Sequence, residues 1–169
     1  YTYDDAPSVI IQEGSAIAYS DPTTNVMVLA DGGFTGTFNT TSFVSNGTLT
    51  GGNGADNITM NGAGVSGSIN LMGGSDTLQL PNGGNSQLTI SNVEYVNGGT
   101  GSDIIAFSGA GAVNINGSQG ADSFTLPATA GASFTFKYTG LSEIGDIING
   151  FVSATDKFEF NRSAFLGDG

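Results

Sequence analysis

The sequence predicts an all-β fold, a right-handed parallel β-roll or β-solenoid built from short stacked coils. The first observation is the stretch GGTGSDIIA at Gly98–Ala106, which fits the nonapeptide G-G-x-G-x-D-x-U-x, where U is a large apolar residue. The second is another full match, GGNGADNIT at Gly51–Thr59. In each repeat a glycine-rich turn leads into a short strand, and one repeat alone cannot bury its apolar face. We therefore expect coils stacked around a narrow apolar core.

Short strands are expected between the turns, because most of these segments alternate apolar with polar residues, as strands with one buried face do. They are residues 57–60, 68–71, 77–80, 104–107, 112–115, 123–126 and 133–136. Before residue 49 no repeat is evident. Strands are expected there at 8–11, 16–19, 26–29 and 36–38, with one more around Phe43 and Val44.

The pattern divides the chain into three parts. Residues 1–48 are expected to be an N-terminal β segment that caps the first coil or pairs with a neighbouring molecule. Residues 49–136 hold the repeats and are expected to form the roll. Residues 137–169 are expected to close it as a C-terminal β cap.

The spacing of four aspartates predicts where the turns lie. Partial matches at 71–79 and 117–125 join the two full ones, so the turns end at Asp56, Asp76, Asp103 and Asp122. One coil of two nonapeptides takes about 18 residues, and the first and third intervals are close to that length, so these turns are expected on one edge of the roll only. The longer middle interval is expected to hold an outward loop or a longer coil at 88–96. The opposite edge is expected at 61–64, 81–84, 108–111 and 127–131, which carry no carboxylate at the ligand position.

These turns present the oxygen atoms that Ca²⁺ prefers. Glycines free backbone carbonyls beside the Asp carboxylates, and Ca²⁺ takes six to eight oxygens at about 2.3–2.6 Å. One turn supplies too few, so each ion is expected between two stacked turns, best between Asp103 and Asp122 and next between Asp56 and Asp76. About two to three structural ions are expected, with folding coupled to binding. The expected ligand residues are Gly51, Asn53, Gly54, Asp56, Gly74, Asp76, Gly98, Thr100, Gly101, Asp103, Gly117, Gln119, Gly120 and Asp122. The alternative is that Gly and Asp merely favour turns.

The composition supports cation binding and excludes several other functions. The 169 residues include 15 acidic and 3 basic ones, no His and no Cys, and no Lys or Arg precedes residue 137. Such a surface repels nucleic acid and anionic membranes, and oxygen ligands favour Ca²⁺ or Mg²⁺. No membrane span is expected, because no apolar run approaches the roughly 18 residues that a spanning helix needs. Each repeat Asp is accounted for by a turn, so we do not expect an enzyme.

The repeats GGNGADNIT, GGTGSDIIA and GSQGADSFT resemble those of the RTX family of secreted bacterial proteins. The run NVEYVNGG at 92–99 is similar to one found in large RTX adhesins and S-layer proteins, and residues 145–165 are similar to the block that closes the roll in serralysin-type proteases. The resemblance implies a β cap in which Asp146 and Asp156 cap the last coil, with Asp146 as a last metal ligand. It also implies type I secretion and an extracellular location at the bacterial cell surface.

Two functions are compatible with these features. The first is a Ca²⁺-dependent extracellular structural protein that self-associates, such as an S-layer, matrix, filament or adhesin subunit, because a roll has open strand edges at both ends. Its expected partner is a second copy of itself or a cell-surface polysaccharide. The second is a C-terminal secretion and stability module of an exported RTX enzyme.

Overall fold

The described part of the chain winds as a parallel β-solenoid between two sheets. The computed structural model describes residues 8–11, 26–29, 32–39 and 46–166. The eight-stranded sheet contains, in order, β1 (Ser8–Ile11), β2 (Val26–Leu29), β4 (Gly47–Thr50), β6 (Ser66–Asn70), β8 (Gln87–Ser91), β10 (Ile104–Ser108), β12 (Ser123–Thr125) and β14 (Ile147–Asn149). The seven-stranded sheet contains β3 (Thr35–Asn39), β5 (Asn57–Asn61), β7 (Thr77–Gln79), β9 (Tyr95–Asn97), β11 (Gly111–Asn116), β13 (Ala132–Tyr138) and β15 (Lys157–Phe160).

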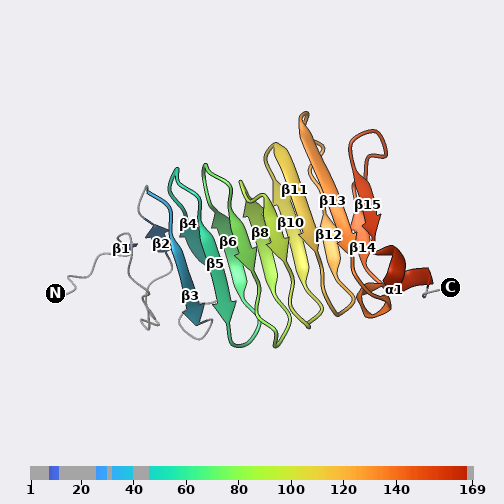
Figure 1. Cartoon of the computed structure of the whole chain (residues 1–169). Helices are drawn as coiled ribbons and strands as arrows, with labels where there is room; N and C mark the ends of the chain where they lie inside the picture. The colour runs from blue at the N-terminus through green and yellow to red at the C-terminus, as the bar shows by residue number, and fades with distance from the viewer. Residues whose placement is uncertain (1–7, 12–25, 30–31, 40–45, 167–169) are drawn as a thin grey trace.

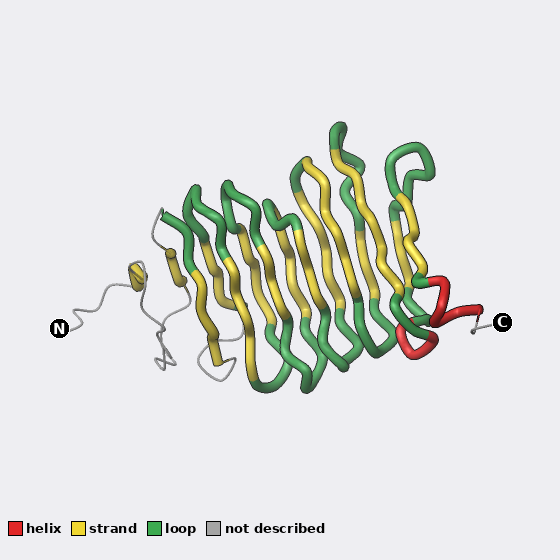
Figure 2. The backbone as a smooth tube through the Cα atoms, viewed as in Figure 1, coloured by secondary structure: helices red, strands yellow, loops and turns green. Residues whose placement is uncertain are grey.

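Consecutive strands from β3 to β15 alternate between the two sheets, and each pairs in parallel with the strand one coil away (Figures 1 and 2). Ile105 in β10, for example, lies in register between Leu88 in β8 and Phe124 in β12. Such stacking satisfies the backbone of each strand with its neighbours on both sides. The all-β parallel roll expected from the repeats is therefore confirmed.

The core lies between the sheets and is built in rows that run along the solenoid axis. One row of the seven-stranded sheet is Ile58, Leu78, Val96, Ile115 and Phe136, in register and at most 1% exposed. The residues between them in each strand face outward and are mostly Thr, Asn, Ser and Gln, as the period of two requires. Toward the C-terminus the rows become aromatic, and the Phe124 and Phe136 rings lie 5.3 Å apart.

The prediction that the four acidic turns share one edge is wrong. Residues 88–96 are neither an outward loop nor an enlarged coil, because β8 and β9 are ordinary members of the two sheets. The interval from Asp76 to Asp103 therefore spans one and a half coils rather than one. Since a half coil carries the chain from one edge to the other, the turns that end at Asp56 and Asp76 lie opposite those that end at Asp103 and Asp122.

The segments before and after the repeats extend the same sheets. Strand β2 pairs with β4, and β14 and β15 pair with β12 and β13. The expected strands at 16–19 and around Phe43 and Val44 lie outside the described residues. After β15 comes α1 (Arg162–Leu166), a short helix that no pattern in the sequence indicated, and η2 (Leu141–Glu143) is a single 3₁₀ turn before β14. Within the ranges the structure describes, neither is long and apolar enough to cross a membrane.

Candidate metal centre

The turns form two edges, which we name by the direction of the chain. The first edge carries the chain from the eight-stranded into the seven-stranded sheet, and the second edge carries it back. First-edge turns are residues 51–56, 71–76, 92–94, 109–110, 126–131 and 150–156. Second-edge turns within the described residues are 62–65, 80–86, 98–103, 117–122 and 139–146.

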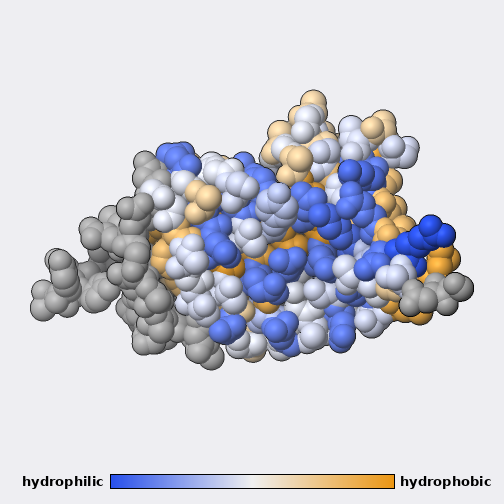
Figure 3. Space-filling model, in the orientation of Figure 1, coloured by the Kyte–Doolittle hydropathy of each residue, from blue (hydrophilic) through white to orange (hydrophobic). Residues whose placement is uncertain are grey.

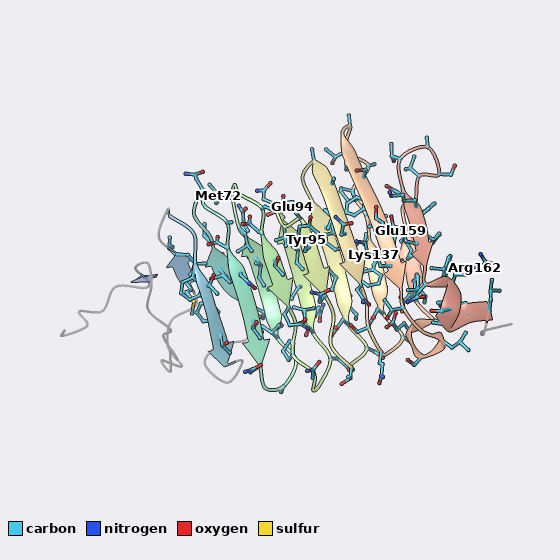
Figure 4. All side chains as sticks on the ribbon, in the orientation of Figure 1. Met72, Glu94, Tyr95, Lys137, Glu159 and Arg162 are labelled. Carbon is cyan, nitrogen blue, oxygen red and sulfur yellow. The ribbon has the colours of Figure 1, made fainter. Side chains whose placement is uncertain are left out.

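A ladder of side-chain hydrogen bonds runs along the first edge. The backbone N–H of Phe34 donates to Oδ1 of Asp56 at 2.7 Å, and the N–H of Asp56 donates to Oδ1 of Asp76 at 2.7 Å. The N–H of Asp76 in turn donates to Oε2 of Glu94 at 2.8 Å. Each of these side chains thus caps the N–H of the equivalent residue one coil earlier. Figure 4 shows Glu94 along the same edge as Met72.

The second edge carries the same ladder in the later coils. Ser86 accepts the N–H of Val65 through its hydroxyl at 3.3 Å, and the N–H of Ser86 donates to Oδ1 of Asp103 at 2.7 Å. The N–H of Asp103 donates to Asp122 at 2.8 Å, and that of Asp122 donates to Asp146 at 3.0 Å. The ladder binds each coil to the next through groups that the strands leave unpaired.

The ladder uses only one oxygen of several carboxylates. The side chains of Asp56, Asp76, Asp103 and Asp122 are buried, each about 1% exposed. In the described residues, Oδ2 of Asp56, Asp76 and Asp122 is buried without a hydrogen-bond partner. Oδ2 of Asp103 accepts the backbone N–H of Gly99 at 3.5 Å, and the equivalent N–H of Gly52 lies close enough to the Asp56 carboxylate to lower its pKa, against the larger effect of burial. A buried acceptor left unpaired costs about 1–3 kcal/mol, and more when it is charged.

Burial makes these carboxylates hard to ionise in the metal-free chain. Burial is the main cause that raises the pKa of Asp122 from 3.8 to about 7. The charges of Asp146 and Asp103 act in the same direction, and the hydrogen bond from the backbone N–H of Asp103 acts against them. Burial likewise raises the pKa of Asp76 to about 6. The pKa values of Asp56, Asp103 and Asp146 are also raised, chiefly by burial. A cation beside these groups would favour their ionised forms.

The unpaired oxygens of Asp56 and Asp122 pack closely against glycines. A Cβ on Gly117 would lie 2.6 Å from Oδ2 of Asp122 and 3.3 Å from Oδ2 of Asp146, so two carboxylates of successive turns converge on this position. A Cβ on Gly51 would likewise collide with Oδ2 of Asp56. Oδ2 of Asp146 also accepts the Tyr138 hydroxyl at 2.8 Å. At both positions the carboxylate therefore occupies the place that a side chain would take.

The two partial repeats lack a glycine at the second position and adopt a different turn conformation from the full repeats, whose equivalent residues Gly52 and Gly99 do not have a positive φ. Met72 and Ser118 both have a φ of 65°, in the left-handed region that side chains other than Gly and Asn seldom adopt. The N–H of Met72 bonds to Oδ1 of Asn70 at 3.0 Å, and the N–H of Ser118 bonds to Oδ1 of Asn116 at 2.9 Å. An Asn two residues earlier therefore supports the turn, which is a local motif that also occurs in other turns.

The predicted ligand residues fall into two groups rather than one. The first edge holds Gly51, Asn53, Gly54, Asp56, Gly74 and Asp76, and the second holds Gly98, Thr100, Gly101, Asp103, Gly117, Gln119, Gly120, Asp122 and Asp146. Asp76 and Asp103 lie on opposite edges, so these two carboxylates do not share a site. Side chains at the third turn position are exposed, and that of Thr100 donates to the carbonyl oxygen of Asn82.

Sequence reasoning missed two side chains of the ladder, Glu94 and Ser86. Glu94 lies 18 residues after Asp76, and Ser86 lies 17 before Asp103, so the coil length alone could have located both. Asp156 caps the last coil, as the family resemblance implied. Its Oδ1 accepts the N–H of Phe134 at 2.9 Å, and its Oδ2 accepts that of Val152 at 2.8 Å.

The donor set limits how a metal ion could be held. Among the residues that the structure describes, no three Asp, Glu, His or Cys side chains gather closely enough to hold an ion on their own. Any site would therefore combine one or two carboxylates with backbone carbonyls and water, which suits Ca²⁺. The donor chemistry of the unpaired Oδ2 atoms of Asp56, Asp76 and Asp122 fits that ion. None of the protein-family models, curated proteins or solved structures compared with the chain matches it.

Proposed function

We propose that this chain is a Ca²⁺-stabilised structural protein of the bacterial cell exterior that self-associates, of the RTX type that its repeats resemble. The observation that carries the Ca²⁺ part is the buried carboxylate with one capped and one unpaired oxygen, repeated at Asp56, Asp76 and Asp122. Three repeats of one unsatisfied geometry are hard to explain by folding alone, because each costs stability.

Asp56 and Asp76 would hold an ion on the first edge, and Asp122 with Asp103 or Asp146 would hold ions on the second. Bound Ca²⁺ supplies positive charge that offsets carboxylate repulsion and desolvation. The residues of the chain position the carboxylates. Oδ1 of each Asp fixes the carboxylate by accepting an N–H from the previous coil. The glycines at 51 and 117 let Oδ2 approach the backbone of its own turn, where a Cβ would collide with it.

A structural role accounts for the acidic residues better than a catalytic one does. The carboxylates of Asp56, Asp76, Asp103 and Asp122 are fixed by the backbone of a neighbouring coil and shielded from solvent. A general acid or base must reach its substrate, and these groups face the interior of the turn stack. Self-association is supported by the ends of the solenoid, where the outermost described strands of both sheets have a described neighbour on one side only.

The proposal is tested by circular dichroism and light scattering of protein freed of metal and then titrated with Ca²⁺. We expect β content to rise on titration and particle mass to rise with it. Equal β content with and without chelator contradicts the Ca²⁺ part. A folded, Ca²⁺-loaded chain that stays monomeric at millimolar Ca²⁺ contradicts self-association and favours the second candidate, a stability module of an exported enzyme, which the likeness of residues 145–165 to the serralysin block supports.

A further inference from the structure

The outer face of the seven-stranded sheet carries one exposed aromatic side chain among polar ones. Tyr95 in β9 is 44% exposed, and its register neighbours are Thr77 in β7 and Asn114 in β11. Inward rings such as those of Phe124 and Phe136 pack against each other, whereas within the described residues Tyr95 has no ring contact. Packing of the core therefore does not explain the large aromatic residue at this position.

Tyr95 borders a shallow groove that crosses four adjacent strands, β7, β9, β11 and β13. Its other polar lining residues are Thr77, Asn97, Asn114, Asn116 and Lys137. Figure 3 shows a mainly hydrophilic surface over the part of the solenoid where Figure 4 labels Tyr95 and Lys137. All four strands pair with a neighbour on both sides, so the groove is formed by the fold itself.

Several polar groups in the groove are available to a ligand. Within the described residues, the Tyr95 hydroxyl, the Asn97 amide and the Lys137 ammonium have no hydrogen-bond or ion-pair partner. In the same part of the chain Asn116 uses only Oδ1, which accepts the N–H of Ser118 at 2.9 Å, and its amide nitrogen is left for a ligand. Amides and a hydroxyl supply both donors and acceptors. An aromatic ring beside a few convergent polar groups in a preformed groove is typical of a small-ligand site.

The charge of this face differs from the charge of the chain as a whole. The net charge of the chain is −12, but the outward positions of the described strands of this sheet carry two cations, Lys137 and Lys157, and one acid, Glu159. Glu159 is the register neighbour of Lys137, but its carboxylate pairs with the Lys157 ammonium at 3.3 Å. The other acidic residues that the structure describes lie outside the strands. The Lys137 end of the groove therefore complements an anionic group on a ligand.

We infer that the groove binds a glycan in which uncharged and carboxylated sugars both occur, with one ring stacked on Tyr95 and a carboxylate paired with Lys137. The polarised C–H groups of a sugar are attracted to the negative face of an aromatic ring. The amides between the two ends of the groove can bond to sugar hydroxyl groups. The groove is separate from the acidic turns and from the ends of the solenoid, so the inference goes beyond the proposed metal binding and self-association.

The distance between the two ends of the groove sets the size of the ligand. Strands β9 and β13 are separated by β11 alone, so Tyr95 and Lys137 lie about 10 Å apart along the solenoid axis. A disaccharide has about this length. The ring over Tyr95 and the ring whose carboxylate reaches Lys137 are therefore close neighbours in the glycan, with Asn114 and Asn116 of β11 between them.

Two other classes of ligand fit the groove less well. A nucleic acid also stacks on aromatic rings, but it carries a phosphate on every unit, which the acidic chain repels and a single lysine does not offset. A peptide that adds a strand needs the edge of a sheet, whereas β9 and β11 are interior strands.

Calorimetric titration of the full chain in Ca²⁺ tests the ligand class. The probe is a hyaluronan hexasaccharide, in which N-acetylglucosamine alternates with glucuronate, and the comparator is an uncharged chitin hexasaccharide. We expect hyaluronan to bind about threefold more tightly, because only this glycan can form an ion pair with Lys137. No binding of hyaluronan, or equal affinity for the two glycans, would overturn the inference.

Matched variants test the two ends of the groove. Y95A should weaken hyaluronan binding about tenfold, whereas I104A should not, because Ile104 is 54% exposed on the outer face of the other sheet. K137Q should weaken binding about threefold and abolish the preference over chitin, whereas R162Q, which removes a charge in α1, should change neither. Equal effects of a variant and its control would contradict the inference. If Y95A loses its β spectrum, N97A replaces it and should weaken binding about threefold; unchanged affinity there would also overturn the inference.

Discussion

Both edges of the solenoid carry capping side chains of the same kind, and Asp156 is a further one on the first edge, in the last coil. On the first edge Asp56, Asp76 and Glu94 cap the previous coil, and on the second edge Ser86, Asp103, Asp122 and Asp146 do so. Capping needs only one acceptor atom, so Ser and Glu serve as well as Asp. Within the described residues, a second, buried oxygen without a hydrogen-bond partner occurs only at Asp56, Asp76 and Asp122. Capping and metal binding are therefore separable functions of one position, and variants should distinguish them.

The largest loss of stability should come from adding a side chain at Gly51 or Gly117. Gly51→Ala and Gly117→Ala each place a methyl group against the Oδ2 of the turn's own Asp. Overpacking of this kind costs about 1–3 kcal/mol, and under the proposed function it would also displace Ca²⁺. Both variants should unfold at lower denaturant concentration in saturating Ca²⁺. Gly140→Ala is the control, because its Cβ would meet only Ser142 Oγ at 3.9 Å. A loss of stability in only one of the two variants would show that the two edges are not equivalent.

Removing one charge should separate capping from metal binding. Asp122→Asn keeps Oδ1 for the N–H of Asp103 but loses the anionic Oδ2, so Ca²⁺ affinity at that site should fall at least tenfold, about 1.4 kcal/mol. Without Ca²⁺ the same variant should be no less stable than the parent, because it removes a buried charge. Asp156→Asn is the control, since both oxygens of Asp156 already accept backbone N–H groups. Isothermal titration calorimetry should show unchanged Ca²⁺ binding for the control. An equal loss of Ca²⁺ affinity in both variants would contradict the view that capping and metal binding are separable.

Metal-free and Ca²⁺-loaded protein should respond to pH in opposite directions. Without metal, the raised pKa values of Asp76, about 6, and Asp122, about 7, mean that the stability these groups contribute is fully present below pH 3.8 and lost as pH rises through those values. β content of metal-free protein should then be higher at pH 5 than at pH 8. In Ca²⁺ the order should reverse, because protons compete with the ion. Circular dichroism after exhaustive dialysis measures both, and parallel pH profiles would contradict metal binding at these groups.

The smallest change in stability should come from Glu94, which caps the N–H of Asp76 and, within the described residues, has no buried oxygen without a partner. Glu94→Gln retains an acceptor for the N–H of Asp76. We expect a change within about 0.5 kcal/mol in stability, as for most changes at partly exposed positions, and the same number of bound Ca²⁺ ions. Loss of an ion in this variant would assign Glu94 to a metal site.

Much of the fold was predictable from residue spacing. The alternation in segments such as 104–107 and 112–115 placed the strands correctly, and Gly-rich turns ending in Asp placed the coils. The edge on which each turn lies was not predictable from the aspartates alone. The interval from Asp76 to Asp103 is compatible with a bulged coil or with one and a half regular coils, and only the pairing of β8 and β9 decides between them.

The ladder was hard to predict, because its chemistry depends on position rather than on residue type. Ser86 and Glu94 match no metal motif, yet they occupy the same turn position as Asp103 and Asp76. The burial of Oδ2 is likewise a property of stacking, since the neighbouring coil supplies the cover. A sequence pattern describes one coil at a time, whereas the hydrogen bonds of the ladder and the burial of Oδ2 each depend on two neighbouring coils.

A Ca²⁺ titration of metal-free protein, followed by calorimetry and circular dichroism together, tests the central claim most directly. The account predicts binding of about two to three ions per chain, shared between the two edges, with β content rising as they bind. No binding at millimolar Ca²⁺, together with the same β spectrum before and after chelation, would contradict it.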